Sequence, residues 1–449
     1  MSEKNTVTTR FAPSPTGYLH IGGLRTAAYA YALAKKHNGK FILRIEDTDQ
    51  KREVPGSKEK IGKLLKLFNL DWDEYYVQSE RVKTGIYQKA AEKLVSEGHA
   101  FYCQCESRNA KKDGFSKILR DPCREKAYTE GAVKLRVPDN EIIKYRDFVH
   151  NKKETSWNTK DVADATLLKS DGFPTYHLAV IVDDTDMEVT HVLRGHDWLP
   201  STPIHLLVYK YLGYKVPEIG HLTDILDPTG GKLSKRKGNV SVDQFIKDGY
   251  LPEALFNFIV LLGWAPKDNR EMFTLSEFVD HFDENGFQRA NPVFNQTKLD
   301  WFNSQYIMKM SDNELAQKLK DFASSPVDVN LLNKISPLVK ERMKKLSDFN
   351  SLAGFFFEEP QFDKSLCSEN FSEHLNAALE VLASTDRWET NSLGENLMNV
   401  VKNSGFKTGD FFMDLRVAVA GRKITPPLNE SMVILGKDVV LSRVKNAIQ

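Results

Sequence analysis

The hydrophobic pattern at the start of the chain alternates between strand and helix. Residues 7–11 combine β-branched and aromatic side chains, which favour a short strand. Residues 24–37 are rich in alanine and leucine and are followed by Asn38-Gly39, a pattern typical of a helix and its end. Residues 40–45 form a mostly apolar run, as expected for a buried parallel strand. This order predicts an α/β fold.

The pattern of apolar and polar residues changes three times farther along the chain. From about residue 100 it consists of short strands and polar turns, and from residue 176 it returns to apolar runs that alternate with helices. From about residue 311 it consists of amphipathic helices joined by polar turns. We therefore predict two halves of one α/β domain at 1–98 and 176–240, an inserted α+β module at 99–175, and helical domains at 241–310 and 311–449.

Composition narrows the class of protein. The chain has 449 residues, of which 41% are hydrophobic, which suffices for several folded cores. Its formal net charge is +1, so nucleic-acid binding would depend on local basic patches. No stretch resembles a signal peptide or approaches the roughly 20 apolar residues that span a bilayer. The four cysteines are not spaced as a disulfide framework. We expect a soluble cytoplasmic protein.

A turn rich in proline and glycine joins the first strand to the first helix. It reads Arg10-Phe-Ala-Pro-Ser-Pro-Thr-Gly-Tyr-Leu-His-Ile-Gly-Gly23. Ligands of α/β sheets bind at the carboxyl ends of strands, and phosphates bind at helix N-termini. Gly22 and Gly23 would let a phosphate or ribose approach the backbone, and His20 could donate a hydrogen bond to a phosphate oxygen. The turn therefore indicates a nucleotide site, against the alternative of an ordinary connection.

Three other features offer candidate chemistry. A loop at 226–238 has glycines on both sides and carries Lys232, Lys235, Arg236 and Lys237. It is either a solvated basic loop, an RNA contact, or a lid that closes on a triphosphate and stabilises the charge on pyrophosphate. Glu46 and Arg194 each follow a predicted strand, where they would bind an ammonium and a carboxylate. The alternative for both is an ordinary ion pair, with Arg44 or Arg52 as the partner of the acidic residues near 46.

Three cysteines lie in the predicted insertion. Cys103 and Cys105 form a C-x-C pair and Cys123 follows, a set that could hold zinc with a fourth ligand. That ligand is not obvious; Glu125 and His99 are nearby, and we take Glu125 as the candidate. The alternative is three reduced thiols.

The two glycine-flanked motifs together resemble the two signatures of class I aminoacyl-tRNA synthetases. The first is the stretch 10–23, and the second is Lys232-Leu-Ser-Lys-Arg236 after Gly230-Gly231. More narrowly, RFAPSPTGYLHIGG is similar to the form found in bacterial glutamyl-tRNA synthetases. The resemblance implies a Rossmann-like catalytic domain, an insertion that binds the tRNA acceptor stem, a helical stem-contact domain and an all-α anticodon-binding region. Some members of the family carry zinc in the insertion.

The resemblance also implies an activity. ATP with Mg²⁺ would activate L-glutamate as a glutamyl adenylate, and the glutamate would then be transferred to tRNA-Glu by an enzyme that we expect to be monomeric. Motif match assigns catalysis to His20, Lys232, Ser234 and Lys235. It assigns the ATP site to His20, Gly22, Gly23, Asp197, Trp198, Leu226, Lys232 and Lys235. It assigns the glutamate site to Arg10, Ala12, Ser14, Glu46, Tyr176 and Arg194.

Within that glutamate site the resemblance gives each end of the amino acid its own partners. Arg10, helped by Tyr176, would pair with the side-chain carboxylate, and Arg194 would lie near the α-carboxylate. Ala12, Ser14 and Glu46 would receive the α-amino group. A neutral glutamine would then leave Arg10 with an unpaired buried charge, which predicts its rejection.

Related proteins supply the alternatives. Glutaminyl-tRNA synthetases typically have Pro-Glu-Pro-Asn where this chain has Pro13-Ser-Pro-Thr16. A paralogue that places glutamate on a queuosine base lacks the helical third. A non-catalytic RNA-binding descendant is disfavoured by the intact His20, Lys232 and Lys235. Whether tRNA-Gln is also charged stays open.

Overall fold

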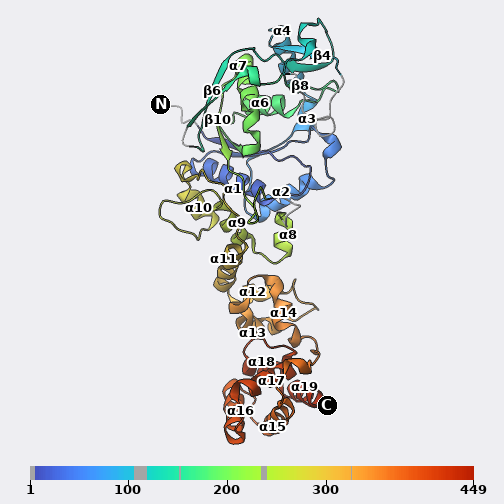
Figure 1. Cartoon of the computed structure of the whole chain (residues 1–449), viewed down its shortest axis with the longest axis vertical. Coiled ribbons are helices and arrows are strands. Elements are labelled where there is room, and N and C mark those ends of the chain that lie inside the picture. Colours follow the sequence, from blue (N-terminus) through green and yellow to red (C-terminus); the bar gives the residue numbers. More distant parts are fainter. Residues whose placement is uncertain (1–5, 106–118, 151–152, 234–239, 325) are drawn as a thin grey trace. The chain divides into compact units, whose positions relative to one another are not determined.

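The chain divides into two compact units. The computed structural model describes residues 6–105, 119–150, 153–233, 240–324 and 326–449. The N-terminal unit contains Met1–Phe245 and Leu255–Asn295, and the C-terminal unit contains Ile246–Ala254 and Gln296–Gln449. The predicted helical segment 241–310 is therefore divided between the two units. Figure 1 shows both units and labels many of their helices and some of their strands.

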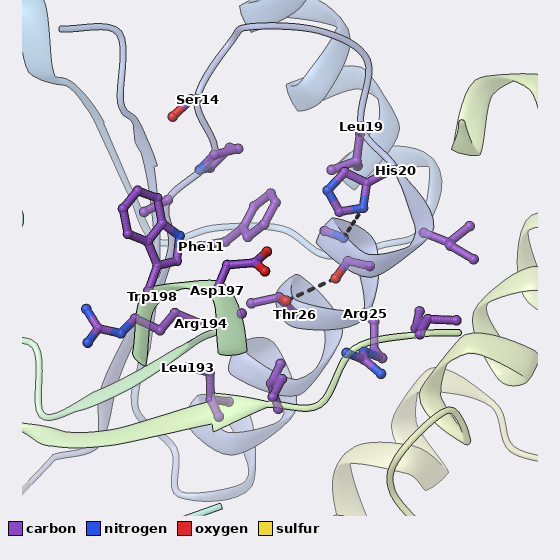
Figure 2. Close-up of a pocket in the computed structure, with 18 of the residues that line it drawn as sticks. Phe11, Ser14, Leu19, His20, Arg25, Thr26, Leu193, Arg194, Asp197 and Trp198 are labelled. Carbon is purple, nitrogen blue, oxygen red and sulfur yellow. Dashed lines mark hydrogen bonds between the residues drawn. The ribbon is translucent and has the colours of Figure 1, made fainter. Parts of the chain in front are cut away.

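A parallel sheet forms the centre of the N-terminal unit. Its five strands have the order β10-β9-β1-β2-β3, and each neighbouring pair is parallel. The strands are β1 (Thr8–Phe11), β2 (Lys40–Ile45), β3 (Glu74–Val77), β9 (His191–Gly195) and β10 (Glu218–Leu222). The β1 side chains are all buried, as expected for a central strand. Because the strands are parallel, their carboxyl ends meet at one edge, beside the pocket drawn in Figure 2.

Helix α1 (Ile21–Lys36) follows β1 across that edge. It begins three residues earlier than the alanine-rich pattern predicted, because His20 caps its first turn through a side-chain hydrogen bond. Its alanines and leucines are buried against the sheet. The remaining helices of this part of the chain are α2 (Ser57–Leu67), α3 (Gln78–Val82), α4 (Ile86–Ser96), α6 (Tyr176–Asp186), α7 (Thr202–Leu212), α8 (Val242–Lys247), α9 (Pro252–Val260) and α10 (Leu275–His281).

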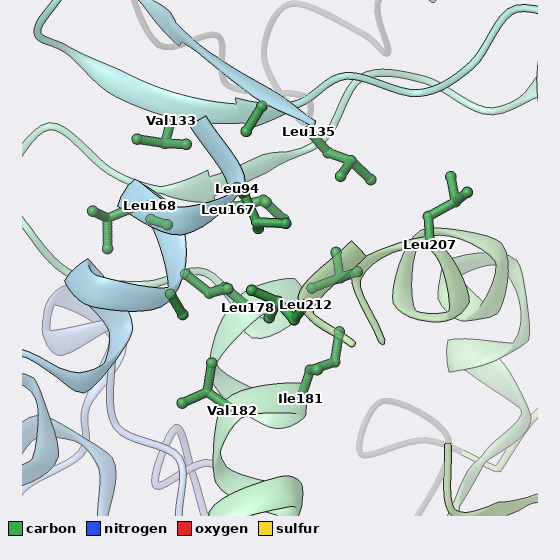
Figure 3. Packing of buried hydrophobic residues seen from close by; sticks show 14 of the residues in the cluster. Leu94, Val133, Leu135, Leu167, Leu168, Leu178, Ile181, Val182, Leu207 and Leu212 are labelled. Atoms are coloured by element: carbon green, nitrogen blue, oxygen red, sulfur yellow. The ribbon is translucent and has the colours of Figure 1, made fainter. Parts of the chain in front are cut away.

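The predicted insertion contains two small antiparallel sheets. One has the order β4-β5-β8, and the other is the hairpin β6-β7. The strands are β4 (Ala100–Cys103), β5 (Ala132–Leu135), β6 (Ile142–Asp147), β7 (Lys153–Asn158) and β8 (Thr166–Leu168). The insertion shares a core with helices α4, α6 and α7: Leu135 and Leu167 pack in the same cluster as Leu94, Ile181 and Leu207 (Figure 3). The two halves of the α/β domain therefore pack directly against the module.

In the described residues of the C-terminal unit, the regular secondary structure consists of helices joined by turns and loops. Its helices beyond residue 295 are α11 (Gln296–Lys309), α12 (Asp312–Leu319), α13 (Val329–Val339), α14 (Phe349–Ala353), α15 (Phe371–Ser384), α16 (Thr390–Ser404), α17 (Thr408–Ala420), α18 (Leu428–Leu435) and α19 (Lys437–Ile448). Two apolar clusters hold them together, one around α12 and α13 and one around α15, α17 and α19. None of the helices in the described parts of the chain has both the length and the hydropathy that crossing a membrane requires.

Candidate active site

A cavity of about 520 Å³ opens at the carboxyl edge of the parallel sheet. The turn 10–23, the ends of β2, β9 and β10, and the start of α6 all contribute to its lining (Figure 2). It brings together these predicted site residues: Arg10, Ala12, Ser14, His20, Gly22, Gly23, Glu46, Tyr176, Arg194, Asp197, Trp198 and Lys232. Leu226 is not among the lining residues and instead bridges to Lys232 through its backbone. Ser234 and Lys235 lie outside the described residues.

His20 is held in one orientation at the start of α1. Its Nδ1 accepts a hydrogen bond from the Gly23 backbone N–H, at 3.1 Å. A neutral imidazole that accepts at Nδ1 carries its proton on Nε2, so His20 can donate from Nε2 to a phosphate oxygen.

The two glycines have a packing role that the sequence did not reveal. A Cβ on Gly22 would lie 3.0 Å from the His20 ring, and one on Gly23 would lie 2.9 Å from Leu19 Cδ1. The glycines therefore make room for the side chains of the turn itself, which is a second reason for their presence.

Lys232 is paired with two carboxylates across the mouth of the cavity. Its Nζ contacts Asp197 and lies 2.9 Å from Asp224 Oδ1. Burial opposes protonation, but the hydrogen bonds that Lys232 donates to the two carboxylates outweigh it and raise the pKa of Lys232. Lys232 is therefore a cation at neutral pH, already bound to groups that an incoming anion would have to displace. Sequence reasoning did not identify Asp224.

Arg10 already has a carboxylate partner, which corrects the expectation that it would stand unpaired without glutamate. It is 3% exposed, its Nε lies 3.1 Å from Asp184 Oδ1, and its Nη1 donates to the Leu193 carbonyl at 3.3 Å. Arg44 contacts the same Asp184 oxygen at 2.6 Å. Burial works against ionisation of Asp184, but the two guanidinium groups outweigh it and lower its pKa.

Glu46 forms an ion pair and also faces the cavity, so the two alternatives predicted for it, an ordinary ion pair and a site residue, are both met. It lines the cavity, and its Oε1 accepts a hydrogen bond from Arg44 Nη2 at 3.0 Å. Burial raises the pKa of Glu46, while Arg44 and Arg10 act in the opposite direction. The residue is therefore positioned by an ion pair and still faces the site.

Arg194 is buried among uncharged groups. The residue is 6% exposed at the end of β9. Its guanidinium N–H groups reach His221 Nε2, His205 Nδ1 and Thr202 Oγ1, each at 2.9 Å, and Tyr176 Oη at 3.3 Å. Burial and the Arg194 cation lower the pKa of His205 well below its usual value, so it stays neutral. Within the described chain, these partners orient Arg194 without neutralising it.

The cysteines do come together, but with a different fourth residue. Sγ atoms of Cys103, Cys105 and Cys123 and a carboxylate oxygen of Asp121 all lie within 4.8 Å of one another. Glu125 is not in this group, because its carboxylate turns to Arg136 at 3.3 Å. Among the residues that the structure describes, the fourth member of the group is thus Asp121 instead of the predicted Glu125, and Asp121 leads into the short helix η2 (Pro122–Glu125).

Sequence reasoning missed the partners behind the site. Asp184, His205 and His221 are buried polar residues inside apolar stretches. Charged and polar groups are rarely buried unless they are paired, so Asp183-Asp184 after the apolar run 178–182 was a signal of a buried ion pair.

Comparison with known proteins shows the family of the chain. The family model described as tRNA synthetases class I (E and Q), catalytic domain, matches residues 6–301, and the model described as anticodon binding domain matches residues 314–448. A glutamate–tRNA ligase of Finegoldia magna is 38% identical over 98% of this chain and 99% of its own length. The chain belongs to the glutamate–tRNA ligase family of class I tRNA synthetases.

Other relatives support the same membership. A glutamate–tRNA ligase of Dehalococcoides mccartyi is 39% identical over 99% of this chain and 97% of its own length. The crystal structure of a glutamate tRNA ligase from Elizabethkingia meningosepticum, in complex with its amino acid, superposes with a TM-score of 0.86 at 33% identity and covers 99% of both chains. The predicted family and fold class are thereby confirmed.

Proposed function

We propose that this chain attaches L-glutamate to tRNA-Glu in an ATP-dependent reaction through a glutamyl adenylate. The observation that carries the proposal is one cavity whose lining combines a capped helix N-terminus with His20, the cation Lys232, Glu46, and an Arg194 whose direct partners are uncharged. These are the groups needed for a nucleoside triphosphate and an amino acid. The family membership, which extends over the full length of the relatives, supports the same reaction.

In the first step the α-carboxylate of glutamate attacks the α-phosphorus of ATP. A new P–O bond forms to the carboxylate oxygen, the bond to the β-phosphate breaks, and pyrophosphate leaves. Mg²⁺ would arrive with ATP as part of the substrate. His20 Nε2 and the N-terminus of α1 would hold phosphate oxygens, and Lys232 would exchange its carboxylate partners for the pyrophosphate. Catalysis is mainly positioning and charge stabilisation.

The amino-acid end of the cavity is distinct. Arg194 would bind a carboxylate of glutamate because its present partners are uncharged. Glu46 holds Arg44 through Oε1, and its carboxylate would accept from the α-ammonium group beside Ala12 and Ser14. Arg10 would contact the side-chain carboxylate while it keeps Asp184. In the second step the ribose hydroxyl of the tRNA end attacks the activated carbonyl, and AMP leaves.

We also propose a structural zinc ion in the insertion. Three thiols and one carboxylate match the four-ligand preference of zinc, and their spacing within 4.8 Å fits one ion. Cys103, Cys105, Asp121 and Cys123 would hold it. The ion would fix the end of β4 to η2 and supply no chemistry to the reaction.

The helical C-terminal unit is the proposed reader of the anticodon, since its residues 314–448 match the anticodon-binding family model. Exposed single-stranded bases in an anticodon loop are recognised by stacking and by hydrogen bonds. The inserted module would contact the acceptor stem.

The proposal is tested by a charging assay with ATP and Mg²⁺. The assay measures attachment of labelled glutamate to tRNA-Glu and tRNA-Gln transcripts side by side. Charging of tRNA-Glu alone would support a discriminating enzyme, and charging of both would support a relaxed one. Failure to charge either transcript, in protein shown to be folded, would overturn the proposed function.

A further inference from the structure

A buried polar chain lies behind Arg194 and is not used by the reaction steps above. It begins at Asp147, the last residue of β6 in the insertion, and continues through His221 on β10 to Arg194 on β9. His221 is fully buried and Asp147 is 4% exposed. The chain thus connects the inserted hairpin to the amino-acid end of the cavity, across 74 residues of sequence.

Asp147 sets the direction of the hydrogen bonds that link it through His221 to Arg194. Asp147 Oδ2 lies 2.7 Å from His221 Nδ1, and the carboxylate also accepts from the backbone N–H groups of His221 and Val149. Burial opposes ionisation of Asp147, but its hydrogen bonds with His221 outweigh this and lower its pKa. An ionised carboxylate only accepts, so Nδ1 of His221 must carry the proton and Nε2 must be the acceptor.

That tautomer is the one Arg194 requires. Arg194 Nε donates to His221 Nε2 at 2.9 Å, and a proton on Nε2 would set two N–H groups against each other. On the other side His205 accepts from Arg194 Nη1 through Nδ1, so its Nε2 carries a proton and faces His177 Nδ1 at 3.1 Å. Two neutral imidazoles therefore fix the plane of the guanidinium from two directions.

Imidazoles are suited to this task because they orient the cation without cancelling its charge. A carboxylate in direct contact would hold Arg194 equally well but would compete with the substrate carboxylate. Asp147 fixes the orientation of the Arg194 guanidinium indirectly, because His221 lies between the Asp147 carboxylate and the guanidinium. Arrangements of this kind, in which a carboxylate fixes a histidine tautomer, orient functional groups elsewhere in proteins.

We propose that Asp147 is a positioning residue for glutamate recognition, acting on Arg194 through the fixed tautomer of His221. The inference rests on the proposed function, because it assumes that Arg194 binds a carboxylate of glutamate. It assigns the inserted hairpin a role in the amino-acid site in addition to any contact with tRNA.

The test compares two buried aspartates of the insertion by steady-state charging of a tRNA-Glu transcript. Asp147→Asn replaces a group that only accepts with an amide that can also donate, so the tautomer of His221 is no longer dictated. We expect the KM for glutamate to rise about tenfold, with kcat, the KM for ATP and the KM for tRNA changed less than about threefold. The matched control is Asp164→Asn. The Asp164 side chain is 1% exposed and accepts hydrogen bonds from the backbone N–H groups of Asp121 and Val137. No hydrogen bond or ion pair described for it joins it to Asp147, His221 or Arg194. The control should lose stability without a change in the KM for glutamate.

A second variant identifies the route and covers a failure of Asp147→Asn to fold. His221→Phe keeps a ring but removes the acceptor for Arg194, and it should raise the KM for glutamate at least as much. In the His221→Phe background, Asp147→Asn should add less than twofold, because both act through the same contact. The inference would be overturned if Asp147→Asn and Asp164→Asn had equal KM values for glutamate, or if His221→Phe left that KM unchanged. In either case, charging by the wild-type protein would still support the proposed function. Absence of charging by the wild type would overturn the proposed function instead.

Discussion

Gly22→Ala separates the packing of the turn from the stability of the helix. Gly22 lies in the first turn of α1, and an added Cβ would sit 3.0 Å from Cε1 and Nδ1 of His20. The ring must then move by a few tenths of an ångström. That movement would lengthen the bond from the Gly23 N–H to Nδ1, now 3.1 Å, toward the limit of a useful hydrogen bond.

The expected effects on stability nearly cancel. Alanine in a helix is more favourable than glycine by about 0.5–1 kcal/mol, and a weakened N-cap costs about 0.5–2 kcal/mol. We therefore expect the free energy of unfolding to change by between a gain of about 0.5 and a loss of about 1.5 kcal/mol. The effect on activity comes from geometry: misplacement of a group by 1 Å costs about a hundredfold in rate, so a few tenths of an ångström should cost about fourfold to tenfold.

The assay is glutamate-dependent exchange of pyrophosphate into ATP, with tRNA-Glu present, alongside thermal unfolding. Gly62→Ala is the control: this glycine lies within α2, and its added Cβ would make an ordinary contact 3.4 Å from Trp72. The control should gain about 0.5 kcal/mol of stability and keep wild-type exchange. Wild-type exchange by Gly22→Ala would refute the argument that this glycine is needed to seat His20.

Three further predictions address the partners of the site. Asp224→Asn removes one of the carboxylates on Lys232, so the KM for ATP should fall by up to about fivefold, the range of a partly exposed ion pair; a rise would show that Asp224 assists ATP binding. Burial and Arg194 lower the pKa of His221 from 6.5 to about 4, so between these values the unfolded state binds a proton that the folded state does not. Urea unfolding should therefore show that the free energy of unfolding falls as the pH falls from 6.5 to 4, and the slope of this free energy against pH should be smaller by about 1.4 kcal/mol per pH unit in His221→Phe. Equal slopes in the two proteins would contradict the lowered pKa. Chelator competition should release zinc more readily from Asp121→Ala than from Glu125→Ala, and the reverse order would restore Glu125 as the fourth ligand.

The features that follow local rules could be predicted from the sequence. Residue types and apolar runs predicted β1, β2 and the body of α1, and the strand-to-helix turn placed His20 and its glycines at the edge of the sheet. The helical character of the C-terminal part also followed from its pattern. These predictions succeeded because each depends on residues close together in the chain.

The partners of the charged groups could not be predicted in the same way. Arg10 meets Asp184 across 174 residues of sequence, and His221 meets Asp147 across 74. Such pairs depend on which strand lies beside which and on how the insertion packs, and no periodicity records that. The shared core of the insertion with α4, α6 and α7 escaped for the same reason, since Leu135 and Leu167 read simply as strand residues.

The pairing of Arg10 changes the argument for why glutamate is chosen over glutamine. Arg10 and Arg44 face Asp184 and Glu46, so these four buried groups balance in charge whether or not a substrate is bound. Asp183, behind them, is paired with Arg81 at 2.8 Å. The groups that contact Arg194 directly are uncharged, and the ionised Asp147 lies one residue farther away, behind His221. With these pairs in place, a bound glutamine would leave no whole buried charge uncompensated. We therefore expect discrimination against glutamine to depend on the direct contact of a second carboxylate with a guanidinium group, because hydrogen bonds to a carboxylate are stronger than those to a neutral amide.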